Sequence, residues 1–134
     1  MSTVYIKTLD AEFAQMLCRT IEAWKIYAIW HEEAQDSWED PNYLLLDNID
    51  VVLLDIRCTP EKAVRFLHRL RQKSKYVEVI LLNTSDRVNA SMDGMQAGAS
   101  DELTVPFDTD TLKKKFWKPV VGEKNRSKGG EECR

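Results

Sequence analysis

Short apolar runs alternate along the chain with segments whose apolar residues recur every three or four positions. The short runs are typical of strands and the recurring pattern is typical of helices. Predicted strands cover residues 4–6, 26–30, 51–55, 77–82 and 103–105. Predicted helices cover residues 11–24, 41–46, a segment from Thr59-Pro60 through Leu70, 86–97 and 108–117.

Residues with special backbone chemistry set the ends of several predicted helices. Asp10 is placed to cap the first helix, Pro41 suits the first position of the second, and Gly98 ends the fourth. The sequence after about residue 120 is charged and rich in glycine, which is typical of a frayed tail. We therefore predict one domain over residues 1–120 and a flexible tail over 121–134.

The alternation of strands and helices predicts an α/β fold of the (βα)5 type. Right-handed crossovers give a doubly wound parallel sheet of five strands, flavodoxin-like, with the strand order 2-1-3-4-5. In such sheets ligands bind outside the carboxyl ends of the strands. Asp55 stands at that place, directly after the apolar run Val51–Leu54. It is either a functional carboxylate or the remnant of one.

Composition narrows the classes of function. With 134 residues, 43% of them hydrophobic, the chain suits one packed domain. A net charge of −3 argues against a nucleic-acid-binding surface, although it leaves room for a local basic patch. No apolar run approaches the roughly 18 residues of a membrane span. Cys18, Cys58 and Cys133 are odd in number and widely spaced, which favours reduced thiols and a cytoplasmic location. The two histidines lack metal-ligand spacing, so we expect no structural metal site.

Four segments, over about residues 3 to 117, resemble the receiver domain of two-component response regulators. They are Asp10–Phe13, Val51–Arg57, Met95–Asp101 and Val105–Asp108. The resemblance implies that Asp55 corresponds to the aspartate that a histidine kinase or a small phosphodonor phosphorylates. It also implies Mg²⁺ held by two more acidic residues, a lysine before a cis proline, a hydroxyl residue ending strand four and a switch aromatic on strand five.

The end of the first strand departs from this pattern. The acidic pair falls on either Lys7-Thr8 or Thr8-Leu9, and neither register supplies two carboxylates. Asp55 alone makes a poor Mg²⁺ site, because Mg²⁺ requires octahedral oxygen ligands. If Lys7 points into the pocket, an ion pair between Lys7 and Asp55 would hold the pocket in one state without phosphate.

The later strands depart from it as well. Asn83 stands at the hydroxyl position, with Thr84 as its neighbour. Val105 replaces the lysine before Pro106, and Glu102 replaces the switch aromatic. Loss of the lysine removes a fixed charge from the phosphoryl oxygens, the kind of electrostatic contribution that dominates such catalysis.

We therefore interpret the chain as a pseudo-receiver, a phosphate-independent protein-interaction module that is not an enzyme and needs no cofactor. One alternative is a single-domain response regulator phosphorylated at Asp55 in an atypical pocket, which alone would require Mg²⁺. Another is an unrelated flavodoxin-like nucleotide or cofactor binder. Against it, no glycine-rich phosphate loop follows the first strand, and the turn 7–10 has no glycine.

The expected partner is a protein, either a histidine kinase or another signalling protein, and neither nucleic acid nor a membrane. The resemblance places partner contacts, including a possible homodimer, on the face made by the fourth helix, fifth strand and fifth helix. Candidate residues on that face are Arg87, Glu102, Lys113 and Lys114.

Overall fold

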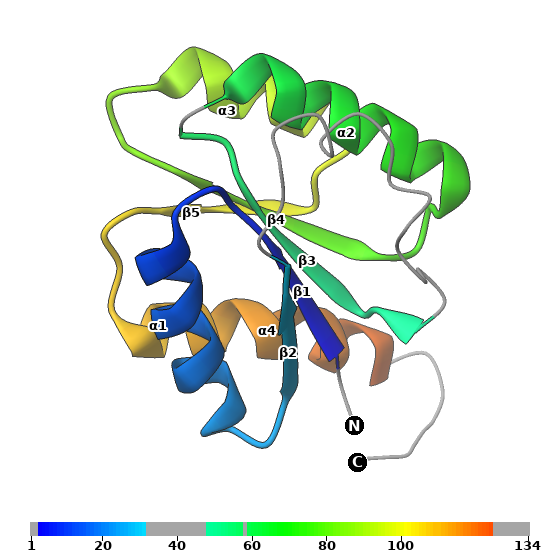
Figure 1. Cartoon of the computed structure of the whole chain (residues 1–134). Helices are drawn as coiled ribbons and strands as arrows, with labels where there is room; N and C mark the ends of the chain where they lie inside the picture. Colours follow the sequence, from blue (N-terminus) through cyan, green and yellow to red (C-terminus); the bar gives the residue numbers. More distant parts are fainter. Residues whose placement is uncertain (1–2, 32–47, 58, 125–134) are drawn as a thin grey trace.

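Five parallel strands form one sheet in the order β2-β1-β3-β4-β5, which confirms the predicted topology (Figure 1). The structure, a computed structural model, describes residues 3–31, 48–57 and 59–124, with side chains up to residue 116. The strands are β1 Thr3–Lys7, β2 Tyr27–Trp30, β3 Val51–Asp55, β4 Glu78–Asn83 and β5 Asp101–Thr104. The described helices are α1 Ala11–Glu22, α2 Pro60–Lys73, α3 Val88–Gln96 and α4 Thr109–Lys124.

Two helical layers enclose the sheet, with α2 and α3 on one face and α1 and α4 on the other (Figure 1). Strand β3 is buried along its whole length, and its side chains alternate between the two cores. Val52 and Leu54 pack on the α2–α3 side, whereas Val51 and Leu53 pack on the α1–α4 side. Continuing this alternation, Asp55 points toward the α1–α4 side, at the carboxyl end of the sheet.

Local chemistry accounts for several of the helix ends. The backbone N–H of Phe13 donates to Asp10 Oδ1 over 3.1 Å, which confirms the cap of α1. α1 ends before the predicted Trp24, and Lys25 then adopts a left-handed φ of 68°. α2 begins at Pro60, and Gly98 follows α3 with a φ of 115°.

Several boundaries differ from prediction by one or more residues, and three of these differences have a physical reason. β5 starts at Asp101 rather than at 103. Only Leu103 of this edge strand is buried, so the strand has no alternating apolar pattern from which its start could be predicted. α3 begins at Val88 rather than at 86, after a turn in which the N–H of Arg87 donates to the Thr84 carbonyl. α4 runs past the predicted end at 117 to Lys124, because a formed helix extends readily into residues of weak propensity.

Two predictions concern segments that the structure describes only in part or not at all. Residues 121–124 of the predicted tail are helical, and the rest of the tail lies outside the described residues. The predicted helix 41–46 also lies outside them. Within the described part of the chain, no helix is both long and apolar enough to cross a bilayer.

Replacing Gly98 with alanine should lower the free energy of unfolding by about 2 kcal/mol, because side chains rarely adopt such a backbone conformation. A Cβ at Gly98 would also lie 3.0 Å from Cγ of Arg71, whose guanidinium donates to the Gly98 carbonyl. Urea unfolding followed by circular dichroism measures the change. A loss below about 0.5 kcal/mol would contradict this account of the turn.

Candidate functional site

Both carboxylate oxygens of Asp55 are engaged, although only 4% of this residue is exposed. Thr8 Oγ1 donates to Oδ2 over 2.6 Å, and the backbone N–H of Arg57 donates to Oδ1 over 3.0 Å. The guanidinium of Arg57 adds a two-pronged ion pair, from Nε to Oδ1 over 2.9 Å and from Nη2 to Oδ2 over 2.8 Å. Such bidentate arginine–carboxylate pairs are among the stronger charged hydrogen bonds in proteins.

The guanidinium of Arg57 is itself held from several sides. It lies over the ring of Phe13 of α1, 4.4 Å from the ring centroid, and Nη2 is 3.7 Å from Asp10 Oδ2. Phe13 in turn packs edge-to-face against Phe107, which follows Pro106 in the loop before α4. These contacts keep a fixed positive charge directly over the Asp55 carboxylate.

Sequence reasoning missed the role of Arg57. A usable signal was present, because a long cationic side chain two residues after a strand-end aspartate can fold back onto that carboxylate. The contact with Phe13 joins residues far apart in sequence, however, and it holds the guanidinium in place.

The predicted ion pair between Lys7 and Asp55 is wrong, because the structure directs Lys7 to the other side of the sheet. Its Nζ lies 5.3 Å from the centroid of the Phe66 ring of α2, and the residue is buried. Successive residues of a strand point to opposite faces, and Thr8 takes the position facing Asp55. The cation predicted for this pocket is therefore present but comes from Arg57.

The residues of this pocket do not fit a Mg²⁺ ion. Thr8 contacts Asp55 at the place where the resemblance implies a metal-binding acidic residue. The oxygens of Asp55 already accept from Arg57, whose positive charge opposes a second cation. In the ranges described, no group of three His, Cys, Asp or Glu side chains is arranged to hold a metal.

The side chain of Asn83, a second predicted pocket residue, is directed toward α3. Its Nδ2 donates to the Arg87 carbonyl over 2.7 Å and to Ser91 Oγ over 2.8 Å. Its Oδ1 is buried without a hydrogen-bond partner. Thr84 instead bonds the carboxylate of Asp86, which lowers the pKa of that exposed group.

Val105, which precedes Pro106, is joined to Asn83 by a backbone hydrogen bond. The N–H of Val105 donates to the Asn83 carbonyl over 2.7 Å, and the bond between Val105 and Pro106 is cis, as the resemblance implied. Val105 packs with the core on the α1–α4 side and offers no charge to the Asp55 pocket.

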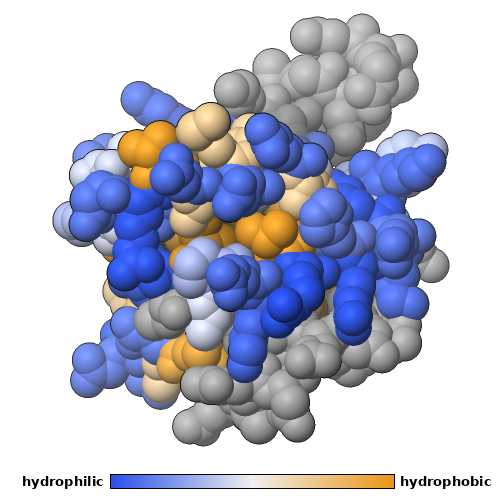
Figure 2. Space-filling model, turned by 90° about the horizontal axis from the view of Figure 1, so that it is seen from above, coloured by the Kyte–Doolittle hydropathy of each residue, from blue (hydrophilic) through white to orange (hydrophobic). Residues whose placement is uncertain are grey.

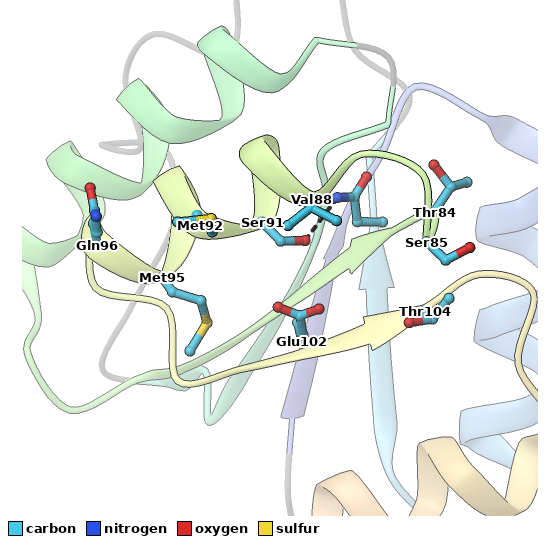
Figure 3. A pocket seen from close by; sticks show the side chains of 10 residues that line it. Thr84, Ser85, Val88, Ser91, Met92, Met95, Gln96, Glu102 and Thr104 are labelled. Atoms are coloured by element: carbon cyan, nitrogen blue, oxygen red, sulfur yellow. Dashed lines mark hydrogen bonds between the residues drawn. The ribbon is translucent and has the colours of Figure 1, made fainter.

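A separate cavity of about 320 Å³ lies between α3, β4 and β5 (Figure 3). Its α3 wall includes Val88, Met92 and Met95, which are 61%, 53% and 40% exposed. Glu102 of β5 points into the space opposite Met95 (Figure 3). The position of the switch aromatic thus carries a carboxylate beside an exposed apolar surface.

The lysines of α4 point in different directions. Lys115 pairs with Asp101 of β5, with Nζ 3.0 Å from Oδ2. The Nζ of Lys113 lies 5.8 Å from the Trp24 ring centroid, toward α1. Arg87, which precedes α3, and Lys114 are exposed. Lys115 rather than Lys113 therefore flanks β5, and a partner face that includes Lys113 and Lys114 stays a prediction.

A family model and several curated proteins are similar to this chain. The family model of the response regulator receiver domain matches residues 10–116. Response regulator protein PmrA of Pseudomonas aeruginosa is 35% identical over 81 residues, covering 60% of this chain and 37% of that protein. Transcriptional regulatory protein BasR of Escherichia coli is 33% identical over 79 residues, covering 59% of this chain and 33% of that protein. The chain thus spans about a third of the length of these curated relatives.

Solved structures show the same fold at low identity. A response regulator receiver domain protein from Clostridium thermocellum superposes with a TM-score of 0.80 at 14% identity, over 95% of this chain and 100% of that one. Chemotaxis protein CheY4 of Vibrio cholerae gives a TM-score of 0.73 at 19% identity, over 88% of this chain and 98% of that one.

Proposed function

We propose that this chain, which belongs to the response regulator receiver domain family, acts in two-component signalling as a pseudo-receiver that binds a partner protein without being phosphorylated. The observation that carries the proposal is the engagement of both Asp55 oxygens by the guanidinium of Arg57. We further propose that the chain is not an enzyme and works without a metal.

The chemistry of acyl phosphate formation supports this reading. A carboxylate oxygen must approach phosphorus as a nucleophile, and cations must neutralise the charge that collects on the phosphoryl oxygens. In this pocket attack by Asp55 would first have to break its partly buried ion pair with Arg57. Thr8 and Val105 supply none of the charge that the reaction needs.

Arg57 also gives the pocket a fixed electrostatic state. Its guanidinium neutralises Asp55 and connects it, through Phe13, to Phe107 before α4. A cation built into the chain in this way removes the need for a phosphoryl group to organise these contacts. We infer that the surface available to a partner does not depend on phosphorylation.

The cavity beside Glu102 is one surface that suits such a partner. Its exposed valine and methionine side chains offer apolar contact area, and Glu102 adds one negative charge. A histidine kinase, another signalling protein or a second copy of this chain would be the partner, in the cytoplasm.

Two other functions compete with this proposal, and the structure and sequence favour them to different degrees. Asp55 is present, so a receiver phosphorylated through an unusual pocket is the competing function. An unrelated nucleotide binder is not favoured, because the receiver family model covers most of the chain. Mass measurement after treatment with a small phosphodonor separates the proposal from its competitor.

A further inference from the structure

The outer face of α2 is basic, although the whole chain carries a net charge of −3. Glu61 is the acidic residue of this helix. The basic side chains of α2 and the turn after it that lie at the surface are Lys62, Arg65, His68, Arg69, Lys73 and Lys75. Positive charge thus gathers along the surface of α2 in an acidic protein. A charged helix face is most often simply solvated, so further observations are needed to assign it a role.

Several of these cations are not used inside the fold. Across the described ranges, Arg65, Lys73 and Lys75 form no ion pair. Arg71 shows the contrast, because its guanidinium donates to the carbonyls of Gly98 over 2.8 Å and Val77 over 2.6 Å. Arg71 therefore binds the backbone of the fold, whereas Arg65, Lys73 and Lys75 can pair with an external anion.

A groove of about 880 Å³ lies between α2 and α3, beside Arg65 and His68. Its floor is apolar, and hydrophobic colour lies in the middle of this face with hydrophilic residues around it (Figure 2). Arg65 and His68 form part of the α2 wall, whereas Asp93 and Gln96 belong to the α3 wall. The remaining lining residues are Pro60, Glu61, Val64, Ala90 and Ala97.

We propose that this groove binds an acidic, amphipathic segment of a partner protein. The inference rests on the proposed function, since it names the chemistry of one partner. Apolar side chains of the segment would lie on the floor formed by Val64 and Ala90, and its carboxylates would pair with Arg65 in the groove wall. Carboxylates farther along the segment would pair with the exposed Lys73 and Lys75. Such charge complementarity mainly contributes specificity and fast association.

The same surface suits a continuous polyanion less well. Glu61 and Asp93 stand on the two walls and would repel nucleic acid or an anionic membrane. A peptide segment can place its acidic residues opposite the cations and leave neutral ones opposite these carboxylates. The most exposed apolar side chains of α3, Val88 and Met92, line the cavity beside Glu102 and not this groove. The groove therefore lacks the exposed apolar side chains that would enter a membrane.

Selection from a random displayed peptide library, without phosphodonor, tests the proposal on the whole chain. We expect enriched peptides to combine acidic with apolar residues and to bind less tightly as salt is raised. Charge reversal in Arg65→Glu should weaken their binding about tenfold. The matched control Arg19→Glu changes an exposed arginine on α1, on the opposite side of the sheet, and should weaken binding less than about twofold.

Enriched peptides without acidic residues, or equal affinity for wild type and Arg65→Glu, would overturn the proposal. Oligothymidylate and phosphatidylserine vesicles are assayed in parallel. If either binds wild type in a way that Arg65→Glu abolishes while no acidic peptide does, the groove belongs to that other class of ligand. Failure here concerns the groove alone, whereas labelling of Asp55 by a phosphodonor would contradict the proposed function alone.

Discussion

Incubating this protein with acetyl phosphate and Mg²⁺ should leave its intact mass unchanged. The nucleophilic oxygens of Asp55 are held by Thr8 and Arg57 at 2.6 to 3.0 Å, and the pocket lacks the ligands that Mg²⁺ requires. Mass spectrometry under mild conditions, which preserve acyl phosphates, measures the result. Asp55→Asn serves as the control, because it removes the acceptor oxygen while nearly keeping the size of the side chain.

A Mg²⁺ titration adds an independent measurement. The indole N–H of Trp30 donates to the Thr8 carbonyl over 3.2 Å, so this fluorophore lies next to the pocket. We expect tryptophan fluorescence to stay constant as Mg²⁺ is added.

In the phosphodonor experiment, addition of one phosphoryl group to wild type and not to Asp55→Asn would contradict the proposed function and favour a phosphorylated receiver.

Replacing Arg57 with alanine should lower the free energy of unfolding by about 2–3 kcal/mol, because it leaves a buried carboxylate without its cation. Arg57 keeps 21% of its side chain exposed and Asp55 only 3%, so the loss falls below that of a fully buried pair. Urea denaturation measures the change. In a double-mutant cycle, adding Asp55→Asn to Arg57→Ala should cost less than the sum of the single changes, by about 1–2 kcal/mol.

The matched control for this measurement is Arg19→Ala, because Arg19 is exposed on α1. Its effect should stay within about 0.5 kcal/mol, as for most surface substitutions. Additive single changes in the cycle would mean that Arg57 and Asp55 do not stabilise each other. The internal cation would then lose its part in the proposed function.

Strand β3 shows how much of the fold could be predicted from local pattern. Its unbroken apolar run identified a strand covered on both faces, and the order of elements then gave the parallel sheet. Asp10 and Gly98 could be recognised because capping depends on residues only a few positions apart. Edge strand β5 was misplaced by two residues, since it buries only Leu103 and leaves little periodic signal.

The sequence by itself determined the topology and the place of Asp55, because these follow from periodicity and residue type. Only the tertiary structure decided which cation neutralises Asp55. Alternation at the end of β1 turns Lys7, its last residue, toward Phe66, and Thr8, the next residue, toward Asp55. Arg57 pairs with Asp55 because Phe13, distant in sequence, supports its guanidinium. Such a contact depends on how α1 packs beside β3, and no local pattern of residues encodes that packing.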